Sequence, residues 1–127
     1  MTRKEIEDRL QELKIEDFIW IIYIGIIALS LYSNSLERKY FINNDIISRN
    51  KYRNIIILIF SILVIVYFYF LKSAYNDLKD IKSTDSKKYK LLNFASYIAS
   101  LLIAISGIIF LIIAIADEDI NIELAFS

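Results

Sequence analysis

Three long stretches without a charged side chain dominate this sequence. They cover residues 18–36, 54–71 and 91–116, so they are 19, 18 and 26 residues long. A hydrocarbon core of about 30 Å is crossed by roughly 20 helical residues. The lengths therefore predict three transmembrane helices, the third of them long enough to tilt or to begin in the headgroup layer.

The predicted fold class is an all-α integral membrane protein with one membrane domain over residues 1–127. Its three transmembrane helices form an antiparallel bundle, preceded by an amphipathic helix over residues 2–16 and followed by an acidic tail over residues 117–127. The alternative is a set of buried core helices in a soluble protein. A soluble helix of this length normally has a polar face, whereas residues 55–71 contain only Ser61 and two tyrosines as polar side chains.

A second alternative is that the first apolar stretch begins as a cleaved signal peptide. Residues 18–29 have the length of a signal-peptide core, and Ala28-Leu29-Ser30 resembles a small-x-small cleavage site. A signal peptide needs a short basic segment before its core. The segment before Phe18 is long and contains more acidic than basic residues, so a retained transmembrane helix is favoured.

The distribution of basic residues predicts the orientation in the membrane. The N-terminal segment and the loop between the second and third apolar stretches contain ten Lys and Arg residues, against five in the loop over residues 37–53 and none in the tail. Cytoplasmic loops carry the excess of positive charge. We therefore expect a multi-pass protein of the cell membrane with a cytoplasmic N-terminus and an external C-terminus.

Small side chains predict which helix faces pack, because close approach of backbones holds transmembrane helices together. At about 100° per residue they form one stripe on each stretch. The stripes contain Ser96, Ala99, Ser100, Gly107 and Ala114 on the third stretch, with Asn93 at the edge, Gly25 and Ala28 on the first, and Ser61 on the second. We interpret them as helix contacts; lining of a polar path or contact between identical copies is the alternative.

Most catalytic chemistry is disfavoured by what the sequence lacks. The chain has no Cys and no His, and no charged side chain lies inside an apolar stretch. These absences remove the commonest nucleophile, general base and metal ligands and the ionisable groups typical of pumps. We expect no catalytic, cofactor-binding or metal-binding residue, and a net charge of zero gives no reason to expect a nucleic-acid partner.

The acidic tail has a pattern of alternating polar residues that resembles part of a metal-binding loop. Asp117, Asp119, Asn121 and Glu123 alternate, like the oxygen ligands that begin a calcium loop. Such a loop needs glycine at its sixth position, where this chain has Ile122. A solvated acidic tail is the favoured interpretation, although the apolar residues that alternate with these positions would also suit a short strand that binds a partner.

The function predicted from these features is that of a small non-catalytic membrane protein, an accessory or immunity-type module that acts through helix–helix contacts. Its partners would be the lipid bilayer and another membrane protein or a second copy. The alternative is a small oligomeric pore former, holin-like or a channel, which the Ser and Asn side chains of the third stretch would permit. The frequent use of Ile, Lys, Asn and Tyr is typical of AT-rich genes and favours a bacterial source.

Overall fold

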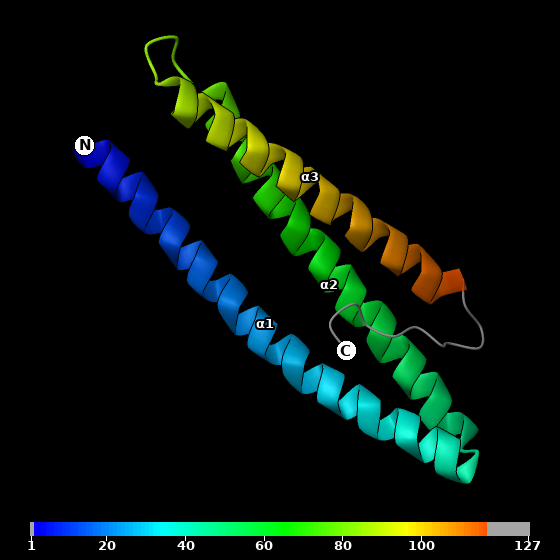
Figure 1. Cartoon of the computed structure of the whole chain (residues 1–127). Helices are drawn as coiled ribbons and strands as arrows, with labels where there is room; N and C mark the ends of the chain where they lie inside the picture. The colour runs from blue at the N-terminus through cyan, green and yellow to red at the C-terminus, as the bar shows by residue number, and fades with distance from the viewer. Residues whose placement is uncertain (1, 117–127) are drawn as a thin grey trace. The chain divides into compact units, whose positions relative to one another are not determined.

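The computed structural model describes residues 2–116, and three α-helices account for almost all of them (Figure 1). The helices are α1 (Arg3–Asn43), α2 (Ile46–Lys79) and α3 (Lys87–Ala116). No strand occurs within the described residues. The prediction of an all-α fold with three long apolar helices is thus confirmed for this part of the chain. The chain divides into two compact units: the first ends at Ile55 and the second begins at Ile56.

Helix α1 begins at a capping box. The Thr2 hydroxyl accepts a hydrogen bond from the backbone N–H of Glu5 at 3.2 Å, and the Glu5 carboxylate accepts one from the N–H of Thr2 at 3.1 Å. This reciprocal pair satisfies two N–H groups that lack partners within the helix. The helix then continues unbroken to Asn43, so the predicted amphipathic segment and the first apolar stretch belong to one helix.

The corner between α1 and α2 is a tight turn in which Asn44 adopts a left-handed conformation, with φ 52° and ψ 36°. Asparagine tolerates this region better than most residues. The next residue, Asp45, caps α2: its carboxylate accepts hydrogen bonds from the N–H of Ile47 at 3.1 Å and from the hydroxyl of Ser48 at 2.9 Å. An Asn-Asn-Asp run is a typical turn and helix-cap signal, and the structure has both here.

The cap makes the start of α2 sensitive to acid. The hydrogen bond from the Ser48 hydroxyl, assisted by the N–H groups of Ser48 and Ile47, holds the pKa of the Asp45 carboxyl below its ordinary value. A lowered pKa in the folded state stabilises the fold above the unfolded value of about 3.9 and ceases to do so as the pH falls further.

We therefore expect Asp45→Asn, which keeps one cap oxygen but cannot ionise, to melt below the native chain at neutral pH. The difference should shrink from about pH 4 downward, where the native carboxyl also becomes neutral. Thermal unfolding in detergent, followed by circular dichroism across this pH range, measures it. A difference that stays constant with pH would contradict the role given to the ionised cap.

The second compact unit contains a helical hairpin made by α3 and by the part of α2 from Ile56 onward. The rings of Phe60 and Phe110 stack with centroids 5.6 Å apart, and the rings of Tyr75 and Tyr97 lie 6.1 Å apart nearer the loop. Residue numbers in contact rise along α2 as they fall along α3, so these two helices run in opposite directions (Figure 1).

The loop of the hairpin is closed by its own polar groups. The N–H of Lys82 donates to the Asp85 carboxylate at 2.7 Å, and the N–H of Asp85 donates to the Lys82 carbonyl at 3.0 Å. Ser86 then caps α3, since its hydroxyl accepts a hydrogen bond from the N–H of Tyr89 at 3.1 Å. The run Ser83-Thr84-Asp85-Ser86 thus separates α2 from α3 and caps α3, as is typical of Ser, Thr and Asp.

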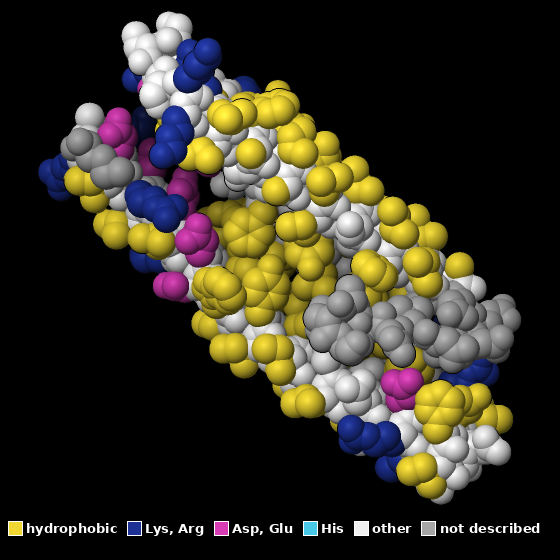
Figure 2. Space-filling model, viewed as in Figure 1, with side chains coloured by type: hydrophobic (Ala, Val, Ile, Leu, Met, Phe, Trp, Pro, Cys, Tyr) yellow, Lys and Arg dark blue, Asp and Glu magenta, His cyan; other side chains and the backbone are white. Residues whose placement is uncertain are grey.

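All three helices are long and apolar enough to cross a membrane. At 1.5 Å per residue, even the 30 residues of α3 span roughly 45 Å. Only 17% of the most apolar window of α3 is buried within the chain. Figure 2 shows hydrophobic side chains over the visible length of α3, with lysines gathered near the hairpin loop. Soluble monomers rarely expose continuous apolar surfaces of this size.

Candidate functional site

Helices α2 and α3 approach each other closely at Gly107. A Cβ atom built on Gly107 would lie 2.8 Å from Cδ2 and 3.2 Å from Cε2 of the Tyr67 ring, and 3.5 Å from a methyl carbon of Val64. Real Cβ atoms are essentially never found as near as the first of these distances. The missing side chain of Gly107 is therefore what lets the Tyr67 ring pack against the backbone of α3, as small residues do between membrane helices.

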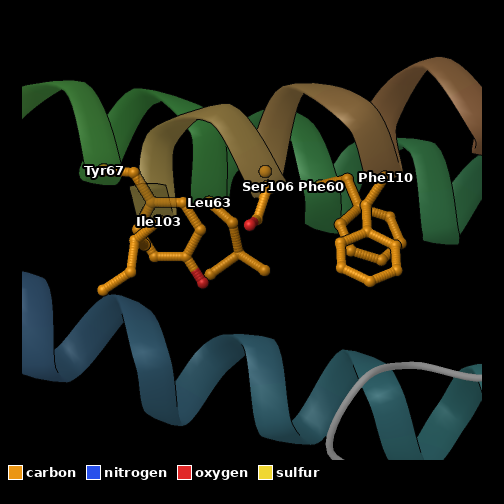
Figure 3. Close-up of a pocket in the computed structure, with 7 residues that line it drawn as sticks. Phe60, Leu63, Tyr67, Ile103, Ser106 and Phe110 are labelled. Carbon is orange, nitrogen blue, oxygen red and sulfur yellow. The ribbon is translucent and has the colours of Figure 1, made fainter. Parts of the chain in front are cut away.

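A groove opens beside this contact, on one side of the hairpin (Figure 3). Its volume is about 210 Å³. Figure 3 shows the stacked rings of Phe60 and Phe110 at one end, Tyr67 and Ile103 at the other, and Leu63 and Ser106 between them. Gly107 completes the lining.

The groove is apolar apart from two hydroxyl groups, those of Tyr67 and Ser106. Sites for small molecules and cofactors usually enclose about 300–1,000 Å³, so this groove is smaller than such a site. Its size suits one side chain of another helix or a few carbons of a lipid chain. No carboxylate or amine lines it, and no group of three or more metal-ligating side chains occurs among residues 2–116.

The small residues predicted to form one stripe on α3 differ in how exposed they are. Gly107 and Ala114 are buried, and Ser100 is half-buried. Ser96 and Ala99 are exposed to the outside of the chain. The exposure of Ala99 has a simple geometric reason, because successive helical residues are about 100° apart and Ala99 directly precedes Ser100.

The predicted small residues of α1 and α2 also differ from one another. Gly25 and Ala28 are exposed, and a Cβ atom built on Gly25 would meet no atom of residues 2–116 within 4 Å. Ser61 is half-buried, and its hydroxyl donates to the carbonyl of Ile57, one turn earlier in the same helix, at 2.7 Å. That donor is therefore used within α2 and does not tie this helix to another.

Several residues of the hairpin contact were missed by the sequence reasoning. Ala104 is buried at 2% exposure. It lies about 40° from Ser100 on the helix, so the periodicity contained the signal. Tyr67, Phe60 and Ser106 carried no comparable signal, because only the pairing of α2 with α3 reveals which aromatic ring faces which small residue.

The calcium-like and strand-like patterns of the tail lie outside the described residues. Comparisons of the whole chain with protein families, with curated proteins and with solved structures gave no match.

Proposed function

We propose that this protein crosses the cell membrane three times, with its N-terminus in the cytoplasm and its C-terminus outside. Each helix exceeds the roughly 20 residues needed to cross the hydrocarbon core, and each exposes large apolar side chains. The two corners, around Asn44 and over residues 80–86, separate the apolar stretches and are rich in polar residues. The excess of basic residues on the side of the hairpin loop supports the orientation.

Three spans joined by two tight corners would form an antiparallel bundle. The hairpin of α2 and α3 supports one half of this arrangement, since its helices run in opposite directions. The turn at Asn44 and Asp45 supports the other half, because only two residues separate α1 from α2.

Within the membrane, we propose, the protein acts as a non-catalytic accessory or immunity-type module that binds another transmembrane helix. The observation that carries this proposal is the exposed pair Gly25 and Ala28 on α1, since no described part of the chain comes within 4 Å of a Cβ atom built on Gly25. Small residues let a partner backbone approach closely. Such a face suits contact with a helix of another membrane protein or of a second copy.

Copurification from native membranes in mild detergent tests the proposal. The native chain should recover a stoichiometric membrane partner, and Gly25→Leu with Ala28→Leu should lose it, because two larger side chains would hold the partner helix away. The matched control is Ile27→Leu, an exposed position of the same helix at which size is unchanged. Recovery of lone monomers from the native chain would contradict the proposal.

Pore formation is the competing outcome, and conductance distinguishes it. On our proposal, planar bilayers that contain the purified chain stay electrically silent. Steady single-channel currents that disappear when Ser96 and Ser100 are replaced by leucine would instead identify the polar stripe of α3 as a channel lining and would overturn the accessory role.

A further inference from the structure

We propose that a groove at the beginning of α3 binds an anionic phospholipid, with the phosphate held by lysines and the acyl chain lying on apolar side chains. The groove is lined by Lys87, Lys88, Lys90, Leu91 and Phe94. This inference rests on the proposed insertion into a membrane and names a class of lipid that the inserted protein would bind.

The five residues gather on one side of a single helix. Lys87, Leu91 and Phe94 are four and then three residues apart, which places them one above another along α3. Lys90 is three residues from Lys87 and four from Phe94, so the amines lie at the loop end and the apolar side chains follow toward the middle of the helix. The groove is shallow and mostly open to its surroundings, and its volume is about 520 Å³.

The charge of the groove suits an anion. The Lys90 amine donates to the backbone carbonyl of Ser83 at 3.2 Å, which fixes its position over the loop without neutralising its charge. No carboxylate within residues 2–116 is paired with Lys87, Lys88 or Lys90. Three positive charges therefore remain for one phosphodiester, which suits the proposed phosphate contact.

The apolar end of the groove suits a hydrocarbon chain. Leu91 is 66% exposed and Phe94 is 52% exposed, although both belong to the uncharged stretch over residues 91–116. A soluble anion such as inorganic phosphate would use the lysines and leave these side chains without a partner. A phospholipid presents a phosphate and an acyl chain in the same order as the amines and the apolar side chains along α3. Lysine side chains at the end of a span reach toward headgroups in the same way.

Native mass spectrometry of the detergent-purified chain tests the site. The probe is an equimolar mixture of phosphatidylglycerol and phosphatidylcholine with identical acyl chains. We expect the native chain to retain phosphatidylglycerol in preference. Each lysine near an anionic lipid is expected to contribute about fivefold to affinity. Replacing Lys87, Lys88 and Lys90 by glutamine should therefore lower the preference at least about tenfold.

The matched control replaces Lys72, Lys79 and Lys82 by glutamine. It removes three positive charges near the same end of the hairpin but leaves the groove intact. The preference for phosphatidylglycerol over phosphatidylcholine should therefore stay within about twofold of the native value. An equal loss in both triple variants would overturn the proposal, since it would indicate charge attraction without a site. Displacement of phosphatidylglycerol by an excess of inorganic phosphate would also overturn it, because the apolar contacts would then contribute nothing.

Alkaline extraction of the expressed chain from membranes separates this inference from the one on which it rests. If the chain resists extraction but shows no preference for phosphatidylglycerol, the lipid site alone is wrong. If the chain is released as a soluble protein, the membrane proposal is wrong, and the lipid site with it.

Discussion

Replacing Gly107 by leucine is expected to separate α2 from α3 and to destabilise the hairpin by about 1–3 kcal/mol, the usual effect of overpacking a well-packed contact. The Tyr67 ring lies 2.8 Å from the position of the first added carbon, and Val64 lies close behind it. Both belong to α2, so the new side chain must push the two helices apart or turn the ring out of its place.

The second glycine of the chain provides the control. A glycine within a helix is about 1 kcal/mol less favourable than alanine, and leucine is nearly as good as alanine. Both Gly107→Leu and Gly25→Leu should gain this helix propensity, but among residues 2–116 a Cβ atom meets a neighbour within 4 Å at Gly107 and none at Gly25. The difference between the two variants therefore isolates the packing at Tyr67.

Thermal unfolding in a mild detergent, followed by the near-ultraviolet circular dichroism of the tyrosines, measures both variants. Gly25→Leu should melt at or above the native temperature, and Gly107→Leu well below it. Adding Tyr67→Ala to Gly107→Leu should recover part of the lost stability, because it empties the space that leucine needs. If Gly107→Leu melts with Gly25→Leu, the close contact at Gly107 does not hold the hairpin together.

Replacing Ile65 by lysine is expected to lower membrane insertion of α2 by about 3 kcal/mol, or about a hundredfold, since this is the usual effect of a lysine at the centre of a span. Ile65 lies near the middle of residues 54–71, and its side chain is 70% exposed. In water a lysine at such an exposed position would change stability by less than about 0.5 kcal/mol. The size of the effect therefore shows whether lipid or water surrounds Ile65 on α2.

The matched control for this substitution is Ile47→Lys. Ile47 belongs to the same helix and is 69% exposed, but it precedes the uncharged stretch. The fraction of chain that resists alkaline extraction from membranes should fall sharply for Ile65→Lys and stay near the native value for Ile47→Lys. Equal fractions for the two variants would indicate that both positions face water.

The sequence indicates where α1 ends and where all three helices begin, because local chemistry decides it. Free backbone N–H groups at the helix starts are satisfied by the pair Thr2 and Glu5 in α1, by Asp45 in α2 and by Ser86 in α3. Each of these caps depends only on residues within one turn. Asn44 likewise tolerates the left-handed turn that ends α1. These signals need no knowledge of the rest of the fold.

The hairpin contact could not be predicted in the same way, because it depends on how two distant segments are aligned. Periodicity on α3 pointed to Gly107, but the choice of Tyr67 as its neighbour follows from the alignment of α2 beside it. A shift of α2 by one residue would present a different side chain to Gly107. For spans in which nearly every residue is apolar, no polar face marks the correct alignment.

Cysteine accessibility in intact cells tests most directly whether hydrocarbon surrounds the three apolar stretches. The chain has no native cysteine, so single cysteines can replace Ile24, Ile65 and Ile105, whose side chains are all exposed. A membrane-impermeant maleimide should leave these three unlabelled even after lysis, label Asn50→Cys from outside, and label Thr84→Cys only after lysis. Labelling of all three isoleucine positions in undenatured membranes would contradict the account, since it would place water where we place lipid.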